Sequence, residues 1–202
     1  MTERAKVLFG TGNPGKQREI RGLLEGLPIE VLFLQDLGDP PEVEETGTTF
    51  EENARLKARG YASLLPGAYV AAEDSGIVVP ALGGEPGVYS ARYGGTRDND
   101  AHNVLLLERM KAFEGEDRAA YYEAVVVLID PTGGETVFRG RVDGLIAEKP
   151  EGNGGFGYDP VFFHEELGRT FGCVSQADKD RFSHRGRAIQ ALRSHLEEVL
   201  GS

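Results

Sequence analysis

Short apolar runs alternate along the chain with longer segments in which apolar residues recur every three or four positions. The short runs predict strands at residues 6–9, 29–34, 69–73, 121–130, 135–142 and 161–163. The longer segments predict helices at 15–25, 50–65, 101–113 and 186–200. This mixture predicts an α/β protein.

Local signals support several of these elements. Thr49 is followed three residues later by Glu52, the spacing of a capping box at a helix start. Residues 131–134 (Pro-Thr-Gly-Gly) separate two apolar runs and predict a β-hairpin. In the last helix, apolar residues at 189, 192, 196 and 200 alternate with charged ones, the pattern of an amphipathic surface helix.

A glycine-containing loop joins the first strand to the first helix. This order directs backbone N–H groups and the positive end of a helix dipole at an anion. Lys16 adds a mobile positive charge in the first helical turn. The candidate phosphate-binding residues are Thr11, Gly12, Asn13, Pro14, Gly15 and Lys16.

Two common fingerprints fit this loop incompletely. Gly10, Gly12 and Gly15 match the dinucleotide-binding pattern, but no regular strand–helix alternation follows, as a Rossmann dehydrogenase would need. The Walker pattern places a Ser or Thr where this chain has Gln17, and Pro14 lacks an N–H group to donate. A glycine-rich turn that only caps a helix is a further interpretation.

The charge balance favours a small ligand. The 202 residues contain 22 Lys and Arg against 33 Asp and Glu, a net charge of −11, which argues against a nucleic-acid surface. A few local lysines can still bind one triphosphate. We expect no secretory leader and no membrane span, and the single cysteine, Cys173, is expected to be a small buried residue in a reducing cytoplasm.

Carboxylates provide candidate metal ligands. Asp74 follows Glu73 at the end of a predicted strand, where α/β proteins place functional groups, and Glu45 precedes the capping box. Mg²⁺ prefers a few carboxylates completed by phosphate and water, so such residues could hold it. The alternative for any single acid is a solvated loop residue.

Three further segments carry polar or aromatic candidates. Asn53 and Lys57 share one face of the second helix and could reach a phosphate, although a surface lysine is the simpler interpretation. Rings spaced by glycines in the segment 154–160 suit base stacking, worth about 1–3 kcal/mol, or else form a core turn. Ser183 is a natural N-cap for the last helix, whose start presents His184 and Arg185.

Taken together, these segments resemble the inosine-triphosphate pyrophosphatase family. The matching stretches are Thr11-Gly12-Asn13-x-x-Lys16-x-x-Glu19, Glu45-Thr46-Gly47-x-x-Phe50-x-x-Asn53-Ala54-x-x-Lys57-Ala58, Asp74-Ser75-Gly76, Leu82-Gly83-Gly84-x-Pro86-Gly87-Val88-Tyr89-Ser90-Ala91-Arg92-Tyr93, Phe156-Gly157-Tyr158-Asp159-Pro160 and Ser183-His184-Arg185-Gly186. They occur in family order over nearly the whole chain. Glu73 departs from the family, which usually has a second Asp there.

The resemblance implies a single domain over residues 1–202, with a mixed α/β fold, a long curved central sheet flanked by helices, and two lobes with a cleft between them. It implies hydrolysis of the triphosphates of inosine, deoxyinosine and xanthosine (ITP, dITP and XTP) to monophosphate and pyrophosphate. It also implies a homodimer.

The resemblance also assigns roles to residues. Asp74 corresponds to the general base and, with Glu45, to a Mg²⁺ ligand. The loop from Thr11 to Lys16, together with Lys57, corresponds to the phosphate-binding residues. The remaining substrate contacts correspond to Ser75, Phe156, Gly157, Tyr158, Asp159, Lys179, His184 and Arg185. A purine-nucleotide sensor without hydrolysis is the alternative from another class.

Overall fold

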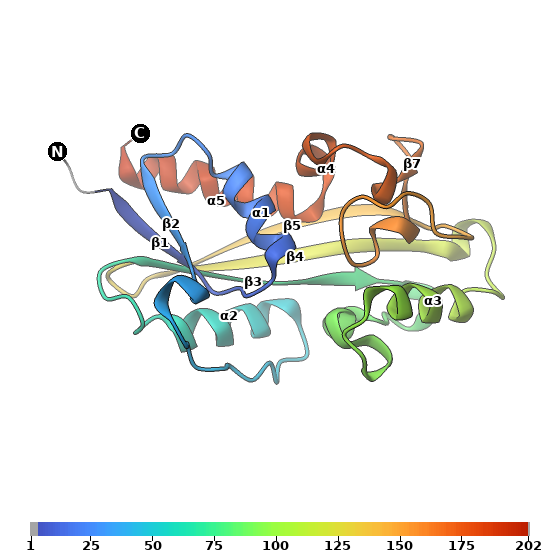
Figure 1. Ribbon diagram of the computed structural model, residues 1–202, viewed down its shortest axis with the longest axis horizontal. Helices are drawn as coiled ribbons and strands as arrows, with labels where there is room; N and C mark the ends of the chain where they lie inside the picture. Colours follow the sequence, from blue (N-terminus) through green and yellow to red (C-terminus); the bar gives the residue numbers. More distant parts are fainter. Residues whose placement is uncertain (1–3, 202) are drawn as a thin grey trace. The chain divides into compact units, whose positions relative to one another are not determined.

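The computed structural model describes residues 4–201 and has a mixed α/β fold (Figure 1). Its sheet has the strand order β2-β1-β3-β4-β5-β6-β7. The strands are β1 (Ala5–Phe9), β2 (Ile29–Phe33), β3 (Tyr69–Val78), β4 (Ala119–Ile129), β5 (Glu135–Ile146), β6 (Phe162–His164) and β7 (Arg169–Thr170). The helices are α1 (Pro14–Leu23), α2 (Phe50–Tyr61), α3 (Asn99–Arg109), α4 (Gln176–Phe182) and α5 (His184–Leu200). The fold class expected from the sequence is confirmed.

The sheet contains both strand orientations. β1 pairs in parallel with β2 and with β3, whereas β5, β6 and β7 pair antiparallel in that order. The predicted hairpin is confirmed, because β4 and β5 are neighbours and Asp130 N–H donates to the Gly134 carbonyl at 2.9 Å across the turn.

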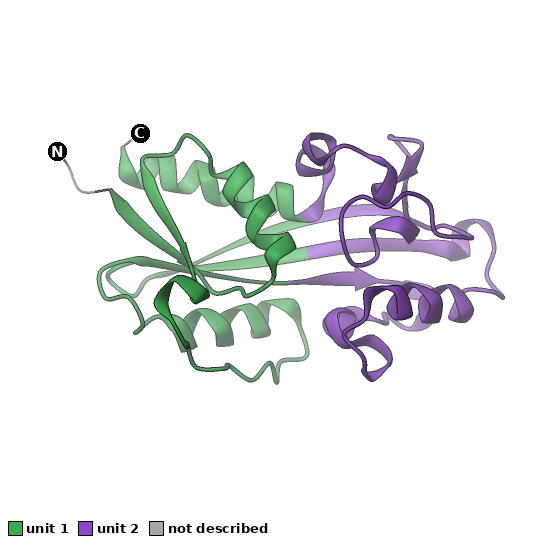
Figure 2. Ribbon diagram, viewed as in Figure 1, with its two compact units in different colours: residues 1–74, 124–140, 185–202 green, residues 75–123, 141–184 purple. Residues whose placement is uncertain are grey.

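The chain forms two compact units (Figure 2). Unit 1 contains the described part of residues 1–74 together with 124–140 and 185–201. Unit 2 contains residues 75–123 and 141–184. Three strands, β3, β4 and β5, contribute residues to both units.

Helices cover both faces of the sheet in unit 1. α1 and α5 lie on one face and α2 lies on the other (Figure 1). The residues of β1 alternate accordingly: Val7 and Phe9 pack into the core that contains α1 and α5, whereas Leu8 packs with Tyr61 of α2. This alternation determines which face each side chain of the neighbouring β3 occupies.

The helix signals read from the sequence are confirmed. Thr49 Oγ1 accepts the Glu52 N–H at 3.1 Å, and the Glu52 carboxylate accepts the Thr49 N–H at 3.2 Å, which completes the capping box. Along α5, Ile189, Leu192 and Leu196 are fully buried. No helix among residues 4–201 has the length and apolar character needed to cross a bilayer.

Several boundaries differ from the predictions. β3 continues to Val78 rather than ending at residue 73, because buried Ile77 restores the apolar alternation after a polar interruption. α2 ends at Tyr61, four residues before the predicted end. α4 and β7 were not predicted, since both are short and mostly polar. Cys173 is exposed, so the expectation that it is buried is wrong.

Arg118 holds together several loops of unit 2. Its guanidinium donates to the carbonyls of Ile146 (2.6 Å), Ala147 (2.7 Å), Met110 (2.9 Å) and Phe113 (3.1 Å). These bonds join the end of β5 to the segment after α3. A single forked cation thereby satisfies four backbone acceptors.

We expect Arg118→Ala to lower the free energy of unfolding by about 2–3 kcal/mol, because charge-assisted bonds are lost and carbonyls are left unpaired. Arg118→Lys should lose less of the free energy of unfolding than Arg118→Ala but still be less stable than the wild type, since an ammonium lacks the planar fork of a guanidinium. Urea unfolding measures both, with Arg97→Ala as a control at an exposed arginine. A loss in Arg118→Ala no larger than in the control would contradict this role.

Candidate active site

The loop after β1 is held by its own side chains. Thr11 Oγ1 accepts the Asn13 N–H at 3.2 Å, and Asn13 Oδ1 accepts the N–H groups of Gly15 (2.8 Å) and Lys16 (3.1 Å). Asn13 is thus the N-cap of α1, with Pro14 in the first turn. The Gly15 and Lys16 N–H groups are thus bonded to a side chain of the loop itself. The positive charge of the loop is that of Lys16.

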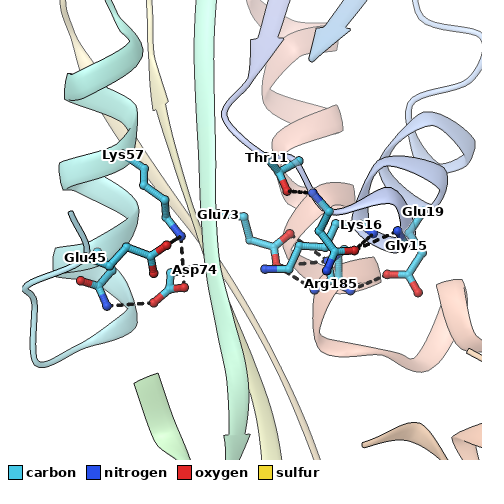
Figure 3. Close-up of polar contacts among 11 residues, drawn as sticks. Thr11, Gly15, Lys16, Glu19, Glu45, Lys57, Glu73, Asp74 and Arg185 are labelled. Carbon is cyan, nitrogen blue, oxygen red and sulfur yellow. Dashed lines mark hydrogen bonds and ion pairs between the residues drawn. The ribbon is translucent and has the colours of Figure 1, made fainter. Parts of the chain in front are cut away.

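β3 places two acids next to this loop, on opposite faces. Phe9 pairs with Ala71, and Gly10 N–H donates to the Ala71 carbonyl at 2.7 Å, two residues before Glu73. Consecutive strand residues point to opposite faces of a sheet. Figure 3 shows this for Glu73 and Asp74, which lie on either side of the β3 ribbon.

Asp74 lies on the α2 face within a set of polar partners. Lys57 Nζ is 3.2 Å from Asp74 Oδ1 and 3.3 Å from Glu45 Oε1. Asn53 Nδ2 donates to Asp74 Oδ2 at 3.1 Å, while Asn53 Oδ1 accepts the Gly47 N–H at 2.8 Å. Asn53 therefore fastens the loop that carries Glu45 to the helix that carries Lys57.

Burial shapes the chemistry of Asp74. Desolvation raises the pKa of this carboxyl above its ordinary value, and the positive charges of Lys57 and Lys16 oppose the rise. A buried carboxylate with a raised pKa, oriented by two donors, is suited to accept a proton.

Glu73 lies on the other face, paired with an arginine from the first turn of α5. Arg185 Nε and Nη2 each donate to the Glu73 carboxylate at 2.8 Å, and Arg185 Nη1 donates to Glu19. Burial by itself would lower the pKa of Arg185, but the charges and hydrogen bonds of Glu73 and Glu19 raise it, so the guanidinium stays charged. Lys16 Nζ is 3.3 Å from Glu73 Oε1.

Unit 2 contains a second set of predicted site residues. Lys179 Nζ donates to Asp159 Oδ2 at 2.6 Å and lies 4.4 Å from the centroid of the Phe156 ring. The same Asp159 oxygen accepts the Phe156 N–H at 2.7 Å. Gly155 has φ +70°, and a Cβ there would overlap the Asp159 carboxylate, so this turn requires glycine. The result is a buried ammonium fixed above an aromatic face.

The neighbouring rings are packed rather than open. Tyr158 is 3% exposed and its hydroxyl donates to the Ser90 carbonyl at 2.9 Å, whereas Phe156 is only half-buried. His184 stacks on Tyr122, with centroids 4.5 Å apart and an interplanar angle of 4°. Stacking of this kind fixes the plane of the imidazole.

A pocket of about 390 Å³ lies beside the loop that carries Phe156. α3 forms one wall through Asn99, Asp100, Asn103 and Val104, and the segment from Pro150 to Pro160 forms the other. Asn103 Nδ2 donates to the Gly157 carbonyl at 3.1 Å, which joins the two walls. α3 is thus hydrogen-bonded to the loop that carries Phe156.

Comparison with known proteins identifies the family. A family model described as the Ham1 family matches residues 7–195. This chain belongs to the Ham1 family. Two curated relatives are both named dITP/XTP pyrophosphatase. A relative from Thermus thermophilus is 49% identical over 95% of this chain and 92% of its own length, and one from Geobacter sulfurreducens is 46% identical over 95% and 96%.

Solved Ham1 proteins share the fold. The Staphylococcus aureus Ham1 protein aligns with a TM-score of 0.86 at 37% identity, covering 96% of this chain and 99% of the other. A structure titled nucleoside-triphosphatase / dITP/XTP pyrophosphatase, from Mycobacterium abscessus, aligns with a TM-score of 0.75 at 41% identity, covering 93% and 98%.

Within this Ham1-family chain, the predicted site residues fall into two groups. Unit 1 contains Thr11, Gly12, Asn13, Pro14, Gly15, Lys16, Glu45, Asn53, Lys57, Asp74 and Arg185. Unit 2 contains Ser75, Phe156, Gly157, Tyr158, Asp159, Lys179 and His184. Sequence reasoning did not identify the partners of these residues, namely Tyr122 under His184, Asn103 under Gly157, and Glu19 and Glu73 around Arg185. Glu19 carried a signal as part of a family motif, and Glu73 carried one as an acid at a strand end where the family usually has Asp.

The donor set around Asp74 fits a divalent cation in part. Among residues 4–201 no three His, Cys, Asp or Glu side chains are grouped as metal ligands. Glu45 and Asp74 nevertheless converge on one ammonium, that of Lys57, so two carboxylates already share a single cation. Mg²⁺ commonly takes one or two carboxylates and completes its shell with water and substrate phosphates. These two residues suit that arrangement.

Proposed function

We propose that this chain hydrolyses non-standard purine nucleoside triphosphates, namely dITP, XTP and ITP, to the nucleoside monophosphate and pyrophosphate. Two relatives that this chain matches over nearly their whole length are named dITP/XTP pyrophosphatase. The observation that carries the proposal is the buried Asp74 carboxylate, bonded to Lys57 and Asn53 and within the electrostatic reach of Lys16.

The phosphate contacts are assigned to the loop after β1 and to α2. Lys16 and Lys57 supply positive charge against the triphosphate, and Thr11 supplies a hydroxyl. Fixed cations stabilise the charge that develops as the anhydride breaks, without reorganising during the reaction. The electrostatic stabilisation that a fixed charge provides is greatest where little water is present. Lys57 meets this condition because it is only 8% exposed.

Asp74 is assigned as the general base. One of its carboxylate oxygens accepts a proton from the attacking water as the water oxygen bonds to the α-phosphorus. The bond from the α-phosphorus to the oxygen that bridges to the β-phosphorus breaks, and pyrophosphate leaves. Asn53 and Lys57 hold the carboxylate in one orientation. Positioned bases of this kind contribute about 10²–10⁴-fold to a rate.

Mg²⁺ is the proposed cofactor, with Glu45 and Asp74 as its protein ligands. When bound, a divalent cation neutralises phosphate charge and makes water more acidic. The contribution of the chain is the pair of carboxylates and the lysines that balance them.

The base contacts are assigned to the segment that carries Phe156 and to Lys179. Phe156 offers a ring for stacking, and Lys179 offers an ammonium, which can only donate hydrogen bonds. A 6-oxo purine accepts from such a donor, whereas the 6-amino group of adenine opposes it. Asp159 holds Lys179 in place through a hydrogen bond. Ser75, His184 and Arg185 are assigned either as further substrate contacts or as residues that position such contacts.

Product analysis tests the reaction. Incubation with dITP and Mg²⁺, followed by ³¹P NMR, should give deoxyinosine monophosphate and pyrophosphate in equal amounts. Release of orthophosphate with a diphosphate product would contradict cleavage between the α and β phosphates. Tight binding without any product would instead support a nucleotide sensor.

We further propose that residues 1–202 act as one domain, because β3, β4 and β5 contribute to both compact units. A homodimer follows from the family resemblance and is tested by analytical ultracentrifugation. A cytoplasmic location suits a chain with a single cysteine and small nucleotides as substrates. The net charge of −11 argues against nucleic acid as a partner.

A further inference from the structure

We propose that Glu73 is a positioning residue for Lys16. Its carboxylate, fixed by Arg185, holds the Lys16 ammonium at the loop after β1 and is not a metal ligand. The inference rests on the proposed function, since it gives this acid a part in binding the triphosphate.

The direction of the side chain separates Glu73 from the metal ligands. Ala71, two residues earlier in β3, packs in the core formed with α1 and α5. Because Glu73 follows Ala71 by two residues, its side chain points to the same face of the sheet, whereas that of Asp74 points toward α2. Figure 3 shows Glu73 with Lys16 and Arg185 on one side of β3, and Asp74 with Lys57 and Glu45 on the other. A cation held between Glu45 and Asp74 is therefore out of reach of Glu73.

The carboxylate of Glu73 is fixed in place. Arg185 Nε lies 2.8 and 3.1 Å from its two oxygens, and Nη2 lies 2.8 Å from Oε1, a forked arrangement that sets the plane of the acid. Glu19 holds the other end of the guanidinium. Glu19 belongs to α1, the helix that begins with Lys16 in its first turn. The network thus joins α1, β3 and α5 around one acid.

Exposure shows which member of the network a ligand can reach. The Glu73 side chain is 1% exposed and that of Arg185 is 3% exposed, whereas Lys16 keeps 17% of its side chain at the surface. Lys16 Nζ and Glu73 Oε1 are 3.3 Å apart. A phosphate can therefore contact Lys16. Glu73 is buried and does not reach the phosphate, but its carboxylate restricts the position of the Lys16 ammonium.

A double-mutant cycle tests this role. Binding of the α,β-methylene analogue of dITP, which resists cleavage, is measured by calorimetry with Mg²⁺ for the wild type, Lys16→Met, Glu73→Gln and the double variant. We expect Lys16→Met to weaken binding about 10- to 100-fold, because a charge-assisted bond is lost. Glu73→Gln should weaken it about fivefold or more, and the double variant should bind within about twofold of Lys16→Met. Independent, multiplicative losses would overturn the proposal.

The Mg²⁺ concentration for half-maximal dITP turnover provides a second measurement. It should be unchanged in Glu73→Gln and raised in Glu45→Gln; an equal rise in both variants would make Glu73 a metal ligand and overturn the proposal. Glu135→Gln, which alters an arginine-paired acid elsewhere in unit 1, is the control for both measurements.

Folding of the variants is checked by circular dichroism. If Glu73→Gln does not fold, because it leaves excess positive charge buried, the cycle is run with Glu73→Asp, which keeps the charge on a shorter arm. A wild type that neither binds nor cleaves dITP would refute the proposed function itself. Normal binding and cleavage with independent losses would refute only the role of Glu73.

Discussion

Asp74→Asn is expected to reduce kcat for dITP by at least about 100-fold, because the variant lacks both the proton acceptor and one proposed metal ligand. The folded state should persist. Burial already disfavours the charged carboxylate, so a neutral amide relieves that cost. This relief offsets the new conflict between the amide N–H₂ and one of the donors, Lys57 or Asn53.

The measurement is the initial rate of pyrophosphate release, with circular dichroism and urea unfolding as checks on the fold. Asp143→Asn is the matched control, since Asp143 pairs with Arg141 at an exposed site, where its side chain is 70% exposed. The control should retain wild-type turnover. Turnover of a folded Asp74→Asn within about threefold of the wild type would remove Asp74 from the reaction.

Lys179→Met is expected to reduce discrimination between purines rather than only the rate. The kcat/KM for dITP should fall about 5- to 150-fold, the loss for one buried hydrogen bond to a 6-oxo group, while that for dATP should change little. The physical reason is that the buried ammonium, held by Asp159 at 2.6 Å, can donate to an oxo group but not accept from an amino group.

Because removing Lys179 leaves Asp159 buried without this cation, the double variant Lys179→Met/Asp159→Asn is measured alongside it to separate loss of selectivity from loss of folding. Lys149→Met, at a lysine whose side chain is 78% exposed, is the control. An unchanged ratio of dITP to dATP in a folded Lys179→Met would show that selectivity arises elsewhere.

The sequence predicted most of the helices and strands because their apolar periodicity was strong. β1, β2, β4 and β5 all carry continuous or alternating apolar runs, and α5 buries Ile189, Leu192 and Leu196 as its spacing implies. Prediction failed where polar function interrupts a regular element. The segment from Asp74 to Gly76 looks like a loop in sequence, yet it lies within β3.

The site was predicted as a set of residues but not as an arrangement. Family motifs identify Asp74, Lys57 and Lys16. That the side chains of Glu73 and Asp74 point to opposite faces of the sheet follows only once both residues are known to lie within β3. The glycine pattern predicted N–H groups directed at an anion in the first loop, and the structure shows that the Asn13 side chain accepts two of them. Such local competition by an Asx side chain is invisible to a pattern of glycines.

The most direct test of the proposed function is a substrate panel for the wild-type protein, in which pyrophosphate release is measured with Mg²⁺ for dITP, XTP, ITP, dATP and dGTP at equal concentration. We predict that kcat/KM for dITP exceeds that for dATP by at least about 100-fold, the product of more than one hydrogen-bond mismatch. Equal turnover of dITP and dATP, or no pyrophosphate from any of the five, would contradict it.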